Sequence, residues 1–273
     1  MAFLFGGNKM LTIPFSGNKK TRYKEVADIV KRGGYNAVYE PFAGSAVLSV
    51  NLYNNKIIEK AVINDYDGLF DIYPEYLDIK EKLVADCLAA GLVKQKELQP
   101  PDKREVLQDL VSKIDKKFWH LLANNFVFSG RRSTEIRLQD FRYFMNETGT
   151  EEQRAYLKII DNLVRCSMDY KQFLKMYGRD YLNEKGLMIV DPPYMNAHQK
   201  SYSNEQYFGL GKTLQLMKAL RTQQRDFIIF NMNRCDITEL LSLFDFNIQE
   251  VRSRYASQCA YSVRDDCMVY VKV

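Results

Sequence analysis

The sequence is poor in the residues that mark several protein classes. Its 273 residues include only 2 histidines and 1 tryptophan, and its 5 cysteines form no CxxC pair. An odd number of widely spaced cysteines predicts neither a disulfide framework nor a zinc site. We therefore expect a protein of a reducing cytoplasm that binds no metal.

Long apolar runs are also lacking. Runs such as 186–190 and 227–230 are far shorter than the roughly 18 or more apolar residues that a membrane-spanning helix needs. The first residues show no cleavable signal pattern. These absences predict a soluble chain without a membrane segment.

What the sequence does contain is typical of a globular protein. Apolar residues make up 46% and charged residues 27%, which excludes disordered, collagen-like and coiled-coil chains. The net charge of +5 permits an anionic partner without requiring one. The charge is unevenly spread, because the segment 111–142 holds seven basic residues against three acidic ones.

Strand and helix patterns alternate at both ends of the chain. Short apolar runs predict strands at 37–40, 61–64, 187–190, 227–230 and 267–273, and helical periodicity predicts helices at 21–31, 46–53 and 213–223. The stretch between is mainly helical, with predicted helices at 76–90, 104–123 and 153–164. The fold class is therefore α/β, a Rossmann-like parallel sheet with a helical insertion. We expect a catalytic domain at 1–69 and 160–273 and a helical insert at 70–159.

The turns that follow the first two strands suggest a nucleoside. Ligands of an open α/β sheet bind outside the carboxyl ends of its strands. The first turn, PFAGS at 41–45, has Gly44, which lets a backbone approach a ligand closely, although any strand-to-helix connection can carry a glycine. Asp65 ends the second strand, where a carboxylate accepts hydrogen bonds from ribose hydroxyls. Together the two turns favour a cofactor that contains a nucleoside, without the GxGxxG phosphate pattern.

The string DPPY at 191–194 directly follows the predicted strand 187–190. Its two prolines fix the backbone and remove two amide donors, so that a carbonyl acceptor at Pro192 lies beside the Asp191 carboxylate. Tyr194 adds an aromatic face. Two acceptors and a stacking surface suit the exocyclic amine of a nucleobase.

Four strings in this order resemble one family. FSGNK at 15–19, EPFAGS at 40–45, IND at 63–65 and DPPY at 191–194 are similar to the motifs of Dam-type DNA adenine N6-methyltransferases of bacteria and phages, over nearly the whole chain. The resemblance implies S-adenosylmethionine as methyl donor and double-stranded DNA as partner. It also implies a target-recognition role for the helical insert and a cytoplasmic monomer or weak dimer, in a bacterium or in the host of a phage.

The resemblance assigns roles to individual residues. The implied catalytic residues, which would bind a flipped adenine, are Asp191, Pro192, Pro193 and Tyr194. The implied cofactor-binding residues are Phe15, Lys19, Glu40, Phe42, Gly44, Ser45, Asp65, Met168 and Asp169. Phe15 stands where the family often has Trp or Tyr, and Met168 or Asp169 would contact the adenine of the cofactor.

The segment 124–133 is the predicted DNA reader, since it interleaves aromatic residues with paired arginines around a glycine. It resembles the recognition hairpin of the family in place, although the residues do not match one for one. The expected DNA-binding residues are Asn125, Arg131, Arg132, Ser133 and, in the polar stretch 195–208, Lys200. Phosphate contact or plain solvation is the alternative for the arginines.

Other functions stay open at this point. A DPPY string also serves cytosine N4-methylation, since the same acceptors suit that amine. An RNA amino-methyltransferase and a catalytically silent DNA-binding homologue are further alternatives, whereas the glycine spacing argues against a dinucleotide oxidoreductase. GATC is the common site of the family, and the departures in 124–133 leave the site of this chain open.

Overall fold

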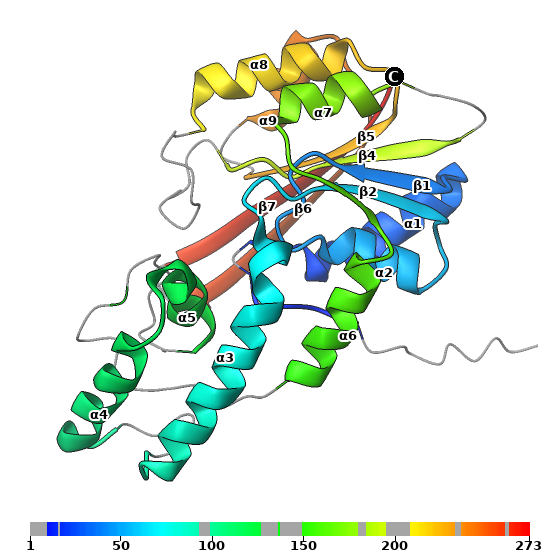
Figure 1. Cartoon of the computed structure of the whole chain (residues 1–273). Helices are drawn as coiled ribbons and strands as arrows, with labels where there is room; N and C mark the ends of the chain where they lie inside the picture. The colour runs from blue at the N-terminus through cyan, green and yellow to red at the C-terminus, as the bar shows by residue number, and fades with distance from the viewer. Residues whose placement is uncertain are drawn as a thin grey trace, which may run out of the picture.

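A seven-stranded sheet runs through the middle of the computed structural model (Figure 1). The structure describes residues 10–15, 17–92, 99–126, 136, 149–179, 184–194, 208–232, 236–259 and 262–273. Of residues 124, 125, 254–259 and 262–265 it describes only the backbone.

The strand order places the first and fourth strands side by side. The strands are β1 (Ala37–Glu40), β2 (Lys60–Asn64), β3 (Val164–Cys166), β4 (Gly186–Val190), β5 (Phe227–Asn231), β6 (Asn247–Cys259) and β7 (Ser262–Lys272), in the order β3-β2-β1-β4-β5-β7-β6. The first five are parallel, and β7 is antiparallel to both β5 and β6. The order reverses between β1 and β4, which is where doubly wound sheets bind their ligands.

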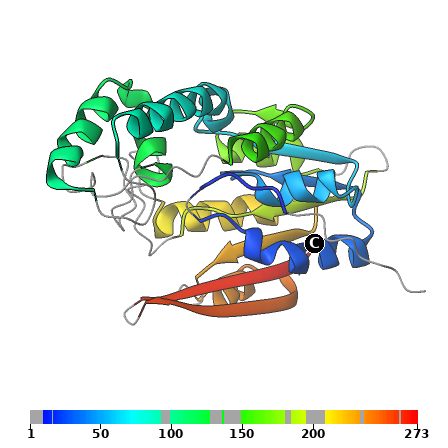
Figure 2. The ribbon, with the colours of Figure 1, turned by 90° about the horizontal axis from the view of Figure 1, so that it is seen from below.

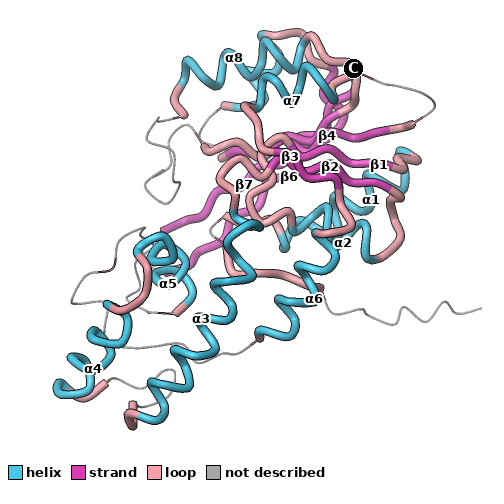
Figure 3. Tube along the Cα trace, in the orientation of Figure 1, coloured by secondary structure: helices cyan, strands magenta, loops and turns pink. Residues whose placement is uncertain are grey.

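Two helix layers cover the sheet (Figures 2 and 3). One face packs against α1 (Tyr23–Gly33) and α2 (Val47–Asn54), the other against α7 (Tyr170–Tyr177), α8 (Leu210–Arg221) and α9 (Ile237–Leu243). Successive strand side chains point to opposite faces, so Val38 of β1 joins the first core and Tyr39 the second. The α/β, Rossmann-like fold class is thereby confirmed.

The helical segment extends from one side of the sheet. It contains α3 (Leu69–Ala89), α4 (Pro101–Ser112), α5 (Trp119–Asn125) and α6 (Thr150–Ile160), with α3 packed between α4 and α6. The apolar side chains of this segment continue the core under α1 and α2. The last helix, α6, also packs on α2. Within the described ranges no helix has both the length and the apolar character of a membrane span.

Two predicted helices are wrong in part. The stretch 104–123 is not one helix, because Asp115 accepts a hydrogen bond from the Lys117 N–H at 2.9 Å and starts a separate turn, Lys116–Phe118, before α5. The stretch 153–164 is not helical to its end, because Val164 begins β3 and pairs with Val62. A local cap causes the first error and pairing with a distant strand causes the second, and each overrides a helical pattern.

The long hairpin β6–β7 passes the carboxyl end of β5. Pairing between β5 and β7 runs from Phe227 with Val271 to Asn231 with Cys267, so the residues of β7 before Cys267 lie beyond the end of β5. Asp266 is the first of these. It is therefore placed at the same edge of the sheet as the residues that follow β1 and β4.

Candidate active site

The turn after β1 leaves no room for a side chain at Gly44. Gly44 has a φ of 50°, and a Cβ added there would lie 2.9 Å from the Cε1 atom of Phe15. Ala46, at φ 52°, takes the same left-handed conformation just before α2. Phe15 thus lies against the turn, and a larger residue at Gly44 would meet both steric and backbone strain.

Glu40, the last residue of β1, is a buried acid. Its Oε1 accepts hydrogen bonds from the Ser49 backbone N–H at 3.0 Å and from the Ser49 hydroxyl, one turn into α2. Burial raises the pKa of Glu40 to about 7, although the bonds from Ser49 act in the opposite direction. The carboxyl group is therefore poised to change its charge near neutral pH.

Asp65 and Asn64 organise the turn after β2. The two carboxylate oxygens of Asp65 accept the N–H groups of Leu69 and Phe70, each at 2.9 Å, and so cap the start of α3. Burial raises the pKa of Asp65, while these two bonds lower it. Each oxygen keeps a second acceptor position.

The side chain of Asn64 ties three segments together. Its Nδ2 donates to the carbonyls of Pro41 at 3.0 Å and Met168 at 2.8 Å, and its Oδ1 accepts from the Met168 N–H at 3.0 Å. Asp169 accepts from the Lys171 N–H at 2.9 Å and caps α7. The expected cofactor residues after β1, β2 and β3 therefore lie together at one edge of the sheet.

Three aromatic rings gather at this edge. Phe42 lies 5.2 Å from Tyr170 and 5.8 Å from Phe208 between ring centroids, and Tyr170 lies 5.9 Å from Phe208. Within the described part of the chain, the buried hydroxyl of Tyr170 has no hydrogen-bond partner. The rings and this hydroxyl offer an apolar, flat-walled surface with one polar atom.

Asp191 begins the turn after β4 and pairs with Lys19. The Lys19 Nζ lies 2.6 Å from Oδ2 of Asp191 and also donates to the Gly17 carbonyl at 2.8 Å. The same ammonium faces the ring of Tyr194 at 5.1 Å. Burial raises the pKa of Asp191 above its ordinary value, and the charge of Lys19 counteracts part of this rise.

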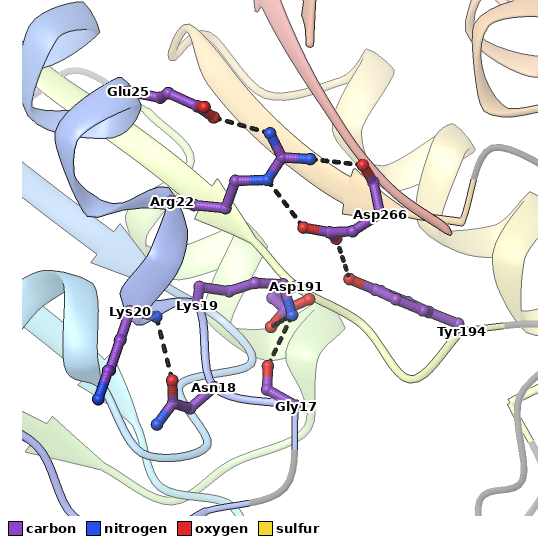
Figure 4. A network of polar contacts seen from close by, with 9 residues as sticks. All are labelled: Gly17, Asn18, Lys19, Lys20, Arg22, Glu25, Asp191, Tyr194 and Asp266. Carbon is purple, nitrogen blue, oxygen red and sulfur yellow. Dashed lines mark hydrogen bonds and ion pairs between the residues drawn. The ribbon is translucent and has the colours of Figure 1, made fainter. Parts of the chain in front are cut away.

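A second polar chain fixes Tyr194 (Figure 4). The Tyr194 hydroxyl donates to Oδ1 of Asp266 at 3.1 Å, and Oδ2 of Asp266 accepts from the Nε of Arg22 at 2.8 Å. Arg22 is fully buried and also donates to Glu25 at 2.7 Å. Side chains from the first helix, β7 and the turn after β4 thus meet around one tyrosine.

The helical segment also contacts the turn after β1. The hydroxyl of Tyr156, on α6, donates to the Ser45 carbonyl inside the buried core. Sequence patterns gave no sign of this contact, nor of the parts played by Arg22 and Asp266. Asn64 could have been found, because it belongs to the IND string beside Asp65.

Not every predicted site residue can be placed. Pro192 and Pro193 follow Asp191 directly, Pro192 being buried. The backbone of Asn125 ends α5, and its side chain is not among the described ones. Arg131, Arg132, Ser133 and Lys200 lie outside the described residues, so their DNA-binding role stays a prediction.

Comparison with known proteins decides the family. The model of the "D12 class N6 adenine-specific DNA methyltransferase" family matches residues 15–257. This chain belongs to that family. Its Dam-type resemblance is confirmed, and the D12 protein is a methyltransferase.

Individual proteins that resemble this chain share little sequence identity with it. A Haemophilus influenzae protein named "Putative methyltransferase" is 22% identical to this D12 chain over 241 residues, which are 86% of this chain and 79% of the relative. Among solved structures, Thermoplasma acidophilum 1320 is 8% identical at a TM-score of 0.43, covering 94% of this chain and 91% of that one. A precorrin-6y C5,15-methyltransferase from Geobacter metallireducens is 9% identical at a TM-score of 0.40, covering 97% and 99%.

The described residues of the D12 methyltransferase hold no group of three or more His, Cys, Asp or Glu side chains that could bind a metal ion. Its polar groups instead line the carboxyl edge of the sheet in two sets. Glu40, Gly44 and Asp65 follow β1 and β2, and Asp191 and Tyr194 follow β4. The arrangement suits two ligands bound side by side, one on each set.

Proposed function

We propose that this protein transfers a methyl group from S-adenosylmethionine to the N6 amine of an adenine flipped out of double-stranded DNA, within a short site such as GATC or a related sequence. The observation that carries the proposal is the position of Asp191. It lies at the carboxyl end of β4, next to β1 and its Gly44 turn, so an acceptor for the amine adjoins the surface we assign to the cofactor.

The residues present fit S-adenosylmethionine. Gly44 and Phe15 form a turn that a Cβ would fill, and Glu40 supplies a buried acid for the methionine amino group. Asp65 keeps acceptor positions for ribose hydroxyls. Phe42, Tyr170 and Phe208, near Met168 and Asp169, would hold the adenine ring. The Tyr170 hydroxyl, which has no partner among the described residues, would hydrogen-bond to that ring.

The residues of the chain would act by positioning. When bound, S-adenosylmethionine supplies an electrophilic methyl group. The lone pair of an adenine amine is delocalised into the ring, so the amine is a poor nucleophile. Asp191 and the Pro192 carbonyl would each accept one N–H, which favours a more tetrahedral nitrogen aimed at the methyl group. The stacking lost when the base leaves the duplex would be replaced in part by Tyr194.

The charge of Lys19 has a place in this scheme. An ionised carboxylate is a stronger acceptor than a protonated one, and burial alone would favour a protonated Asp191. Lys19, at 2.6 Å from Oδ2, opposes that protonation. The other carboxylate oxygen would then take the amine N–H.

Glu40 makes cofactor affinity depend on pH. Its pKa is about 7 in the free protein, and a bound ammonium group would favour the charged form and lower that pKa. We therefore expect S-adenosylmethionine affinity to fall as the pH drops below about 7, by up to about tenfold per pH unit. Calorimetric titration with S-adenosylmethionine at several pH values between about 5.5 and 8.5 measures the change in affinity. This range covers about 1.5 pH units on either side of the pKa of Glu40.

The matched control is Glu40→Gln, which keeps the size of the side chain and cannot titrate. Its affinity should be weaker than that of the wild type at pH 8 (about one unit above the pKa) and flat across the range. A wild-type affinity that is equally flat would contradict the assignment of Glu40 to the methionine end.

Sequencing of modified bases tests the function as a whole. The chain would be expressed in cells that lack endogenous DNA methylation, with Asp191→Ala as the inactive control. We expect N6-methyladenine in one short motif, absent from the control. Modified cytosine would favour N4 chemistry, and unmodified DNA from a folded protein that binds S-adenosylmethionine would favour an RNA substrate or a silent homologue.

A further inference from the structure

The side chain of Arg22 binds both the side chain and the backbone carbonyl of Asp266. The Nε of Arg22 donates to Oδ2 at 2.8 Å, and an Nη donates to the Asp266 carbonyl. The arginine side chain is 0% exposed, so these charge-assisted bonds lie in the protein interior. A planar guanidinium that is held by two groups of Asp266, and by Glu25 on its other side, fixes this part of β7.

The free side of Asp266 is directed at the motif tyrosine. While Oδ2 is held by Arg22, Oδ1 accepts the Tyr194 hydroxyl at 3.1 Å (Figure 4). Asp266 therefore links two residues that lie far apart in the chain. The link is part of the described site, because Tyr194 also faces the ammonium of Lys19 and its hydroxyl also hydrogen-bonds to Asp191, a contact that partly offsets the rise that burial causes in the pKa of that carboxyl.

A tyrosine hydroxyl lies on the axis about which its ring rotates, so a hydrogen bond at the hydroxyl fixes where the ring lies rather than its rotation about that axis. The bond to Asp266 therefore restrains the Tyr194 side chain at its Cα–Cβ bond and holds the ring in one position. A stacking partner whose position is set before the base arrives costs less entropy on binding.

We propose that Asp266 and Arg22 are positioning residues that hold the Tyr194 ring in the position at which the target base stacks. This inference rests on the proposed function. It separates two roles within the DPPY string: Asp191 receives the amine, and Tyr194 is a surface whose position is set from β7 and the first helix. Neither Arg22 nor Asp266 touches the base.

The test combines a spectroscopic and a kinetic readout on the full chain. The protein would be labelled with 3-fluorotyrosine, and Tyr194→Phe would assign one resonance among the 18 tyrosines. Asp266→Asn keeps an oxygen for Arg22 and turns an amide nitrogen, which cannot accept, toward Tyr194. We expect this variant to shift the Tyr194 resonance, and Glu25→Gln, which removes another partner of Arg22, to leave it in place.

Methyl transfer to DNA is the second readout. Tyr194→Phe and Asp266→Asn should each lower kcat about tenfold, in line with the loss of one hydrogen bond to a charged group, with the KM for S-adenosylmethionine unchanged. The rate loss of the double variant should be smaller than the product of the two single losses, because both substitutions remove the bond between Tyr194 and Asp266.

Two results would overturn the inference: a Tyr194 resonance that ignores Asp266→Asn, or rate losses that multiply in the double variant. A melting curve for each variant shows that it is folded. Failure of the proposed function looks different, since the wild type would then transfer no methyl group to DNA while the resonance still reports on the link.

Discussion

Replacing Asp191 by alanine should lower the rate of methyl transfer about 10³-fold, while binding of DNA and of S-adenosylmethionine changes little. The estimate follows from the typical loss when one preorganised polar group is removed from an active site. Asp191 is the carboxylate at the end of β4, and Lys19 already holds its Oδ2 at 2.6 Å. Single-turnover transfer of a labelled methyl group to a duplex measures the effect.

Asp191→Asn is the sharper variant, because it preserves shape. Its amide oxygen would stay with Lys19, and its amide nitrogen would turn a donor toward the donor N–H of the amine. We therefore expect a loss close to that of alanine. Asp28→Asn is a suitable control, since Asp28 forms an exposed pair with Arg32 on α1. Near-normal turnover by Asp191→Ala would remove Asp191 from the reaction.

Replacing Arg22 by methionine should lower the free energy of unfolding by about 3 kcal/mol, since breaking a buried ion pair leaves its partners without compensation. Arg22 is 0% exposed, and its loss would leave Asp266, Glu25 and the Asp266 carbonyl without their shared donor. Urea unfolding followed by far-UV circular dichroism measures the change.

Arg32→Met is the matched control for that measurement. Arg32 also pairs with two acids, Asp28 and Glu250, but its side chain is 55% exposed. Solvent screens such pairs, so the substitution should cost far less than that of Arg22. Equal losses from the two variants would show that burial is not what makes the Arg22 pairs important.

The sequence predicts the strands that short apolar runs mark. The prediction at 37–40 coincides with β1, and that at 187–190 falls within β4, because these strands are buried on both faces. β3 was missed because it has three residues and its side chains are largely exposed. β6 was missed because polar residues dominate it, and its pairing with β7 forms it.

The site residues also differ in whether a local sequence pattern predicts them. Gly44, Asp65 and Asp191 lie in strings that can be recognised locally, and all of them reach the carboxyl edge of the sheet. The link from Arg22 to Asp266 joins residues 244 positions apart, and that from Tyr156 to Ser45 joins residues 111 apart. No local pattern encodes such contacts, since they depend on how the elements pack.

The neighbouring positions of β1 and β4 also bear on how the protein folds. Ala37 pairs with Gly186 although the whole helical segment and two other strands lie between them in the chain. Closing so long a loop costs conformational entropy, whereas a helix forms between neighbouring residues and does not have this cost. The helices can therefore form early, whereas the turns that carry Gly44 and Asp191 come together only when this distant pair has closed, so the proposed methyl-transfer site is among the last features that the newly made chain acquires.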